Sequence, residues 1–289
     1  MIRPNAPSVA PPPEGQIRYK LTVSYDGTTF HGFAKNPDVE TVEGLLIEAL
    51  QKVLGKAPTL TCAGRTDAGV HAKAQIVSFD SVTFEINRIQ KALNALCHPS
   101  VVITSIEETT DDFNARFSAK SRTYRYQILN QAHPDPFLSR YTWHVYSPIS
   151  IEKMNTAGQK LLGQHDFSSF CRKNIMEIDG QKVAASLIRE IKTLRWEVPD
   201  KNLIELWVTA NAFCHQMVRS ITGTLVDIGV GKIDEFSMLE ILNSRDRNMA
   251  GQVAPPHGLT LWNVNYLVSK KILHYMPSDG CLMKPITVS

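Results

Sequence analysis

The sequence predicts an α/β protein of the α+β type, built as two halves that share the element order β-α-β-β-α-β. Strand-like segments with alternating apolar residues and helix-like segments with apolar residues three or four positions apart follow one another in that order twice along the 289 residues. Hydrophobic residues make up 43% of the chain and charged residues 20%, which is typical of a soluble protein with a sizeable core. Two such units favour two split βαβ sheets side by side, with a cleft between them.

The first half begins with a strand and a capped helix. Polar and apolar residues alternate in residues 18–25 (RYKLTVSY), which are rich in strand formers. An Asp-Gly pair at residues 26–27 then turns the chain. Residues 41–54 (TVEGLLIEALQKVL) carry apolar side chains at helical spacing, with Thr41 as the candidate N-cap and Gly55 as the stop. The remaining elements are predicted as two strands, a helix and a strand at residues 59–63, 74–79, 86–96 and 101–107.

The second half repeats the order less regularly. Helices are predicted at residues 151–162, ended by Gly163, at residues 214–228, and near residues 237–242. Strands are predicted at residues 122–129, 142–146, 187–197, 203–210 and 259–266, with a turn at residues 199–202.

These elements divide the chain into four parts. Residues 1–16, rich in Pro, Ala and Ser, are predicted to be a flexible tail, and the halves follow at residues 17–111 and 112–268. Residues 269–289 show no clear period and are interpreted as a C-terminal tail. The N-terminus lacks the apolar run of a secretion signal, and no segment approaches the ~18 apolar residues that span a bilayer, so we expect no membrane partner.

Cysteine usage and missing motifs exclude several classes of protein. Five scattered cysteines without C-x-x-C spacing indicate neither a disulfide framework nor a zinc site, and they fit a reducing cytoplasm. No H-x-x-x-H pair occurs, so no metal is expected, and His71, His165, His215 and His257 are interpreted as structural. No G-x-x-x-x-G-K-[ST] or G-x-G-x-x-G is present, which excludes the usual nucleotide cofactors. The net charge of +3 is too small by itself to indicate a nucleic-acid partner.

The stretch CAGRTDAGVHAKAQ places one carboxylate, Asp67, among small residues. Gly64 and Gly69 relieve steric limits on the backbone on both sides of it. Arg65 shares its face if the chain is extended, and would then hold the carboxylate ionised and aimed. An Asp in such a turn also often caps its own backbone, so the residues alone leave a catalytic carboxylate and a plain turn as equal alternatives.

A basic and aromatic segment, NARFSAKSRTYRY, occupies residues 114–126 and contains no acid. Strand alternation puts Arg122, Tyr124 and Tyr126 on one face. Cations for phosphates beside rings for bases suit a flexible or single-stranded nucleic acid, whereas a solvated strand face with a tyrosine in the core is the alternative. The cations of the segment are Arg116, Lys120, Arg122 and Arg125.

Arg219 lies in the otherwise apolar helical stripe of FCHQMVRSITG. An unpaired buried charge is costly, so Arg219 needs an anionic partner, for which Asp67 and a substrate phosphate are the candidates. Gly223, one turn later on the same face, leaves space beside it. The equal alternative is that Arg219 extends to the surface.

Seven short motifs occur between about residues 18 and 266. The most specific is GRTDAGVHA at residues 64–72, and the others are YDGTTFHGF (25–33), ALNALCHPSV (92–101), DFNARFSAKSRTYRY (112–126), GQHDFSSF (163–170), HQMVRSITGTLVDIG (215–229) and APPHGLTLW (254–262). In their order along the chain, these motifs resemble those of the tRNA pseudouridine synthase A family, whose members isomerise uridine in the anticodon stem-loop of tRNA.

The resemblance implies a sheet platform of two pseudo-symmetric halves with helices on one side and a basic cleft between the halves. It also implies a homodimeric isomerase that acts on nucleotides 38–40 of tRNA and needs no cofactor or metal. Asp67 matches the family's catalytic aspartate, Tyr124 its active-site tyrosine and Arg219 its active-site arginine. Ala34 and Lys35 replace the polar residues that many members carry there, which bears on substrate contacts of that loop and not on the chemistry.

Pseudouridine formation breaks the bond from ribose C1′ to uracil N1 and joins C1′ to C5, so no atom is gained or lost. A carboxylate assists by attacking the base or C1′, or by removing a proton from C2′, and the residues do not choose among these routes. Tyr124 is expected to stack on the flipped uracil and to assist loss of the C5 proton. The residues expected to bind tRNA are Tyr124, Arg65, Arg116, Lys120, Arg122 and Arg125.

Two other functions remain open from the residues. The same cations and rings suit a non-catalytic RNA-binding or RNA-folding module, in which Asp67 has no role. A hydrolase that uses Asp67 as nucleophile on a small glycoside generally needs a second carboxylate as acid, and no other acid stands out.

Overall fold

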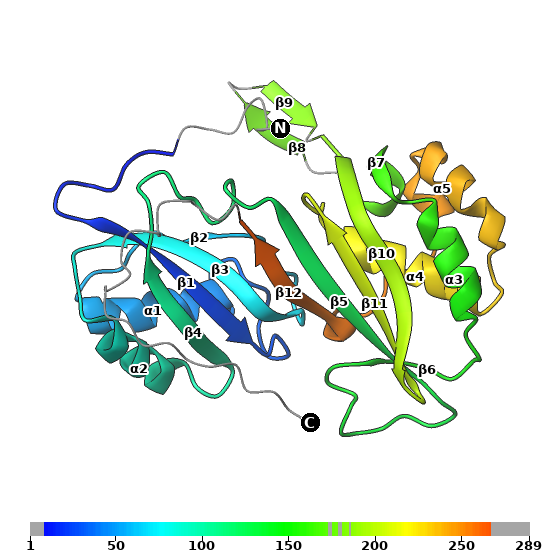
Figure 1. Ribbon diagram of the computed structural model, residues 1–289, viewed down its shortest axis with the longest axis horizontal. Coiled ribbons are helices and arrows are strands. Elements are labelled where there is room, and N and C mark those ends of the chain that lie inside the picture. The colour runs from blue at the N-terminus through cyan, green and yellow to red at the C-terminus, as the bar shows by residue number, and fades with distance from the viewer. Residues whose placement is uncertain (1–8, 173–174, 179–180, 185, 267–289) are drawn as a thin grey trace, which may run out of the picture.

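The N-terminal half contains every element that the sequence predicts, in the predicted order (Figure 1). The computed structural model describes residues 9–172, 175–178, 181–184 and 186–266. Helix α1 begins after Thr41, whose side chain accepts a hydrogen bond from Gly44 N, and ends at Gly55, whose φ is 77°. The elements of this half are β1 (Ile17–Tyr25), α1 (Val42–Leu54), β2 (Thr61–Cys62), β3 (His71–Ser81), α2 (Ile86–Cys97) and β4 (Val101–Glu108).

The C-terminal half contains the predicted elements and three further strands. Its strands are β5 (Ser121–Asn130), β6 (Trp143–Val145), β7 (Gly163–Asp166), β8 (Ile175–Ile178), β9 (Gln181–Ala184), β10 (Ile188–Asp200), β11 (Leu203–Ala210) and β12 (Leu259–Asn265). Its helices are α3 (Ile151–Gln159), α4 (Met217–Gly229) and α5 (Met238–Ser244), with 3-10 turns η1 (Ser168–Phe170), η2 (Glu235–Ser237), η3 (Arg247–Met249) and η4 (Pro256–Gly258).

Three local predictions in this half were wrong. Helix α4 begins at Met217 and not at residue 214, because Gln216 before it has a φ of 63°, which a right-handed helix does not adopt. Helix α3 ends at Gln159 and not at residue 162, because the next three residues make the tighter hydrogen bonds of a 3-10 turn, such as Leu161 N to Gly158 O at 3.0 Å. Gly163 is therefore not the residue that ends the helix; it begins β7, which pairs with β10. The sequence of β7, GQHD, carries no apolar alternation by which a strand is recognised.

Ten of the described strands form one mixed sheet that runs through both halves. The main path has the order β4-β1-β3-β12-β5-β11-β10-β7, with β2 paired to β3 and β6 to β5, while β8 and β9 form a separate hairpin. The halves meet where β12 pairs in parallel with the start of β3, at Thr260 opposite His71 and Leu261 opposite Ala72. Further along the same edge, β3 pairs with β2, so the loop between β2 and β3 lies at this seam.

Helices α1 and α2 lie together beside the strands of the N-terminal half, and α3, α4 and α5 lie together beside those of the C-terminal half (Figure 1). Helix α4 is the most enclosed of them, because every residue in it except Arg219 is buried. The chain is therefore a mixed α/β protein with one large sheet, and α4 brings a single cation to the seam.

The two predicted tails fall largely outside the described residues. Residues 1–8 and 269–289 are not described, and residues 9–16 precede β1 without helix or strand, with Ala10 O accepting a hydrogen bond of 3.0 Å from Arg18 Nη2. Within the described ranges, no helix has the length and apolar content needed to cross a bilayer.

Candidate active site

Residues 63–70, between β2 and β3, form the loop that carries Asp67, and we call them the Asp67 loop. The fully buried side chain of Gln75 holds its first turn, since Nε2 donates to Gly64 O at 2.6 Å and Oε1 accepts from Gly64 N at 3.4 Å. The hydroxyls of Tyr25 and Thr66 share a hydrogen bond of 2.8 Å. These contacts fix the backbone immediately before Asp67 to strands β1 and β3.

The motif YDGTTFHGF, at residues 25–33, forms backbone hydrogen bonds with the Asp67 loop. Phe33 N donates to Thr66 O at 3.1 Å, and Gly69 N donates to Phe30 O at 3.3 Å. Gly32 has a φ of 93°, and a Cβ there would lie 2.9 Å from Thr66 O. Such close approach of two backbones requires glycine, so the two motifs are structurally one unit.

Asp67 contacts two side chains from the segment 215–219 of the other half. Arg219 Nη1 lies 3.1 Å from Asp67 Oδ2, and His215 Nε2 lies 3.4 Å from Asp67 Oδ1. The side chain of Asp67 is 27% exposed, that of Arg219 14% and that of His215 44%. Arg219 is itself fixed, because its Nε donates to Ala254 O at 2.8 Å. The carboxylate is thus anchored at Oδ2 by Arg219, has the longer contact to His215 at Oδ1, and stays partly exposed as a side chain.

Tyr124 lies beside the same loop. Its ring, 8% exposed, packs edge-on against Phe213 at 5.1 Å, and its hydroxyl would lie 3.8 Å from a Cβ at Gly64. Burial raises the pKa of the Tyr124 hydroxyl; Arg122 opposes this effect, and the charge of Asp67 adds to it. The hydroxyl therefore stays protonated and is a neutral hydrogen-bond donor beside Gly64 at the start of the Asp67 loop.

A family model described as tRNA pseudouridine synthase matches residues 21–118 and 157–267. The tRNA pseudouridine synthase A of Bacillus subtilis is 38% identical over 254 residues, covering 86% of this chain and 99% of the relative. That of Halalkalibacterium halodurans is 37% identical over 270 residues, covering 92% and 99%. The chain belongs to the tRNA pseudouridine synthase A family. It is therefore a tRNA pseudouridine synthase, an isomerase.

The geometry of this synthase separates the two cations that the sequence offered as partners of Asp67. Arg65 is exposed and makes no hydrogen bond or ion pair with any residue that the structure describes. Arg219, 152 residues away in sequence, makes the contact instead. His215 was interpreted as structural and instead reaches Asp67. Its position four residues before Arg219 in the same motif was the available signal, because residues so spaced near a helix share a face.

Arg122 was expected to bind tRNA, but its side chain is buried. It is 6% exposed, and its guanidinium donates to backbone carbonyls at distances from 2.6 to 3.4 Å. The prediction of a shared face with Tyr124 and Tyr126 is confirmed, but that face is buried. Arg122 therefore joins chain segments inside the synthase and is not available to a phosphate. The accepting carbonyls belong to Ala63, Arg116, Ala119 and Asn211.

Arg125 also has protein partners, on the opposite face of β5. Its guanidinium lies 4.2 Å from the ring of Trp262, and it donates to Gln127 Oε1 at 2.6 Å and to Glu205 Oε1 at 3.4 Å. Arg116 and Lys120, by contrast, have exposed side chains. Of the four cations in the segment, these two remain candidates for phosphate contact in the synthase.

Proposed function

We propose that this synthase isomerises uridine at nucleotides 38–40 of the anticodon stem-loop, with Asp67 as the nucleophile or base. One observation carries the proposal: Arg219, from the other half of the chain, fixes Oδ2 of a carboxylate that is still 27% exposed. A reactive carboxylate must be ionised, aimed and reachable, and an arginine on one oxygen supplies the first two properties.

The two oxygens of Asp67 have different tasks in this proposal. Oδ2 stays on Arg219, whereas the one contact of Oδ1 with a described residue is the longer one, 3.4 Å to the half-exposed His215. Oδ1 is thus the atom that meets the flipped nucleoside, by attack on the base or C1′ or by removal of the C2′ proton. The Tyr124 hydroxyl, close to Gly64 of the same loop, assists loss of the C5 proton by donating a hydrogen bond to the base and not by taking up that proton, because its raised pKa keeps it protonated.

We further propose two pseudo-symmetric halves with a basic cleft between them. The strand order supports this: β4-β1-β3 with β2 on β3 corresponds to β12-β5-β11 followed by β10, with antiparallel pairing at each step. The exposed cations Arg65, Arg116 and Lys120 supply positive charge near the seam where tRNA would lie.

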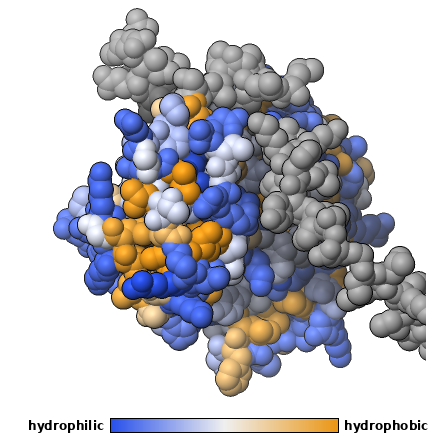
Figure 2. Space-filling model, turned by 60° about the vertical axis from the view of Figure 1, so that its left-hand side comes forward, coloured by the Kyte–Doolittle hydropathy of each residue, from blue (hydrophilic) through white to orange (hydrophobic). Residues whose placement is uncertain are grey.

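Assembly as a homodimer and a cytoplasmic location complete the proposal. Figure 2 shows hydrophobic side chains gathered on the surface of the N-terminal half among hydrophilic ones, and such patches often mark protein interfaces. Phe137 in the other half is 89% exposed. We expect sedimentation equilibrium to give about twice the chain mass of 32.3 kDa, whereas the monomer mass would contradict the dimer.

The direct test of the reaction is to incubate unmodified tRNA transcripts with the protein and to map pseudouridine by primer extension after carbodiimide treatment. We expect new stops at nucleotides 38–40 and no free uracil. Free uracil without isomerised product would indicate the hydrolase, and tRNA binding without either product would indicate a binding module.

The exposed cations should set the salt dependence of tRNA binding. We expect Arg116→Ala and Lys120→Ala each to weaken binding and to reduce the slope of log K against log salt by about 1, because each phosphate contact releases about one counterion. Filter binding at several salt concentrations measures the slope. Arg88→Ala, an exposed arginine on α2, is the matched control, and an equal loss there would show a general effect of charge.

A further inference from the structure

Residues 254–257, from the motif APPHGLTLW, connect the two sides of the active site. At one end, Ala254 O accepts from Arg219 Nε at 2.8 Å and Ala254 N donates to Arg219 O at 3.1 Å. At the other end, His257 O lies 3.0 Å from His71 Nε2. Between them, Pro256 packs against Gly69 of the Asp67 loop. One short segment therefore touches both the arginine and the loop that carries the carboxylate.

His71 is a buried imidazole, and both of its ring nitrogens have hydrogen-bond partners. It is 3% exposed, and its Nδ1 accepts from Gly27 N at 2.9 Å. Nδ1 is then unprotonated, so Nε2 carries the hydrogen and donates to His257 O. Burial lowers the pKa of His71, while Asp26, 3.2 Å from Nδ1, opposes that effect.

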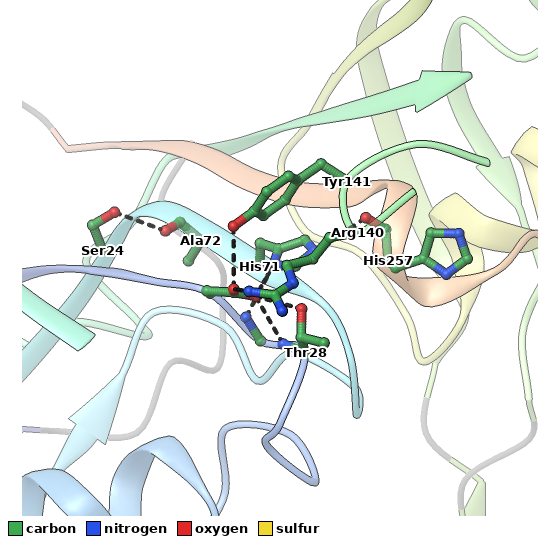
Figure 3. A network of polar contacts seen from close by, with 9 residues as sticks. Ser24, Thr28, His71, Ala72, Arg140, Tyr141 and His257 are labelled. Carbon is green, nitrogen blue, oxygen red and sulfur yellow. Dashed lines mark hydrogen bonds and ion pairs between the residues drawn. The ribbon is translucent and has the colours of Figure 1, made fainter. Parts of the chain in front are cut away.

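Two more exposed residues, Arg140 and Tyr141, contact Asp26 and His71 from the solvent side. Tyr141 and Arg140 point toward the carboxylate of Asp26, with distances to Oδ2 of 3.1 Å from the hydroxyl and 3.4 Å from Nη1 (Figure 3). The ring of Tyr141 also lies 5.0 Å from that of His71. Residues 140–141 and His257 belong to the C-terminal half, and Asp26 and His71 to the N-terminal half. We call these five residues, 26, 71, 140, 141 and 257, the seam clasp.

We propose that His71 is a positioning residue for the isomerisation, whose hydrogen bond to His257 O sets the distance between Asp67 and Arg219. The proposal depends on the role of Asp67 proposed above. His71 follows Asp67 by four residues, through a turn closed by Val70 N to Asp67 O at 3.1 Å. Arg219 is fixed to Ala254, and His71 is joined to Asp67 by a short turn. If His71 shifts relative to His257, the Asp67 carboxylate therefore shifts relative to the Arg219 guanidinium. A displacement of about 1 Å at a reacting group can cost about 100-fold in rate.

Two substitutions separate this role from a general contribution to folding. In His71→Gln the amide nitrogen replaces Nε2 and keeps the donor to His257 O, whereas in His71→Asn the amide oxygen replaces Nδ1 and keeps the acceptor for Gly27 N. We expect His71→Asn to lose about 10- to 100-fold in single-turnover rate at saturating enzyme, and His71→Gln to stay within about 5-fold of the parent. The two variants should have similar Tm and similar Kd for tRNA.

Equal rate losses in both variants, or losses that follow Tm, would overturn the proposal. If neither variant folds, Tyr141→Phe weakens the clasp from outside by removing one hydrogen bond. It should lower the rate several-fold, while Tyr146→Phe, a 77% exposed tyrosine nearby in the chain, should leave it unchanged. An unchanged rate in Tyr141→Phe would then overturn the proposal.

The proposed function and the clasp fail in different ways. An inactive Asp67→Asn together with a normal rate in His71→Asn overturns the role of His71 alone. Near-normal activity of Asp67→Asn overturns the proposed chemistry and the positioning role with it.

Discussion

Replacing Asp67 with Asn will abolish pseudouridine formation and leave the fold and tRNA binding intact. Asparagine has the same shape, so the Asp67 loop keeps its backbone contacts. The amide, however, is neither a nucleophile nor a base and loses the ion pair of 3.1 Å with Arg219. We expect a decrease of at least about 10⁴-fold in rate, as is typical when a reacting side chain is removed.

This result is measured as the single-turnover rate on tRNA transcripts, together with Tm and filter binding. Asp112→Asn is the matched control, because Asp112 is an exposed aspartate within a family motif and has no side-chain hydrogen bond among the described residues. Turnover by Asp67→Asn within about 10-fold of the parent would remove the carboxylate from the mechanism, and a fall in Tm would mean that the side chain also supports the loop.

Local chemistry explains why much of the fold could be predicted. The cap of α1 is an example, because Thr41 and Gly55 act through neighbours within four residues. The pairing of Asp67 with Arg219 could be predicted only as one of two options. A cation in an apolar helix demands an anion, but the anion's identity depends on how β12 joins the two halves at β3.

The remaining errors in predicting the site concern which side chains are buried by other parts of the chain, and this depends on tertiary packing. Alternation in SRTYRY correctly put Arg122 and Tyr124 on one face, but alternation does not say whether that face meets solvent. For the same reason the contact of His215 with Asp67 could not be predicted, because it joins segments that are 148 positions apart in the sequence. A cation in a nucleic-acid-binding protein is thus readily interpreted as a phosphate ligand even when it serves the fold.

Arg122→Met provides the decisive test of that correction. Methionine fills much of the same volume but donates no hydrogen bonds, so the carbonyls that Arg122 serves lose their donor within the protein. Leaving buried polar groups unsatisfied costs about 1–3 kcal/mol each, and the loss of such a network commonly totals about 3–5 kcal/mol. We therefore expect Tm to fall by roughly 6–20 °C for a chain of this size.

Arg122→Lys separates the structural role from phosphate binding. Lysine keeps the charge, but its single ammonium group cannot reach all the carbonyls that the planar guanidinium bridges, including Ala63 O at 2.8 Å and Asn211 O at 2.9 Å. A structural Arg122 therefore predicts a clear loss of Tm in both variants, with the salt slope of tRNA binding unchanged in both. A phosphate ligand predicts the reverse: a parental Tm in both variants, and a slope reduced by about 1 in Arg122→Met alone. Because Ala63 is the first residue of the Asp67 loop, the structural outcome would also mean that this buried arginine helps to fix the start of that loop.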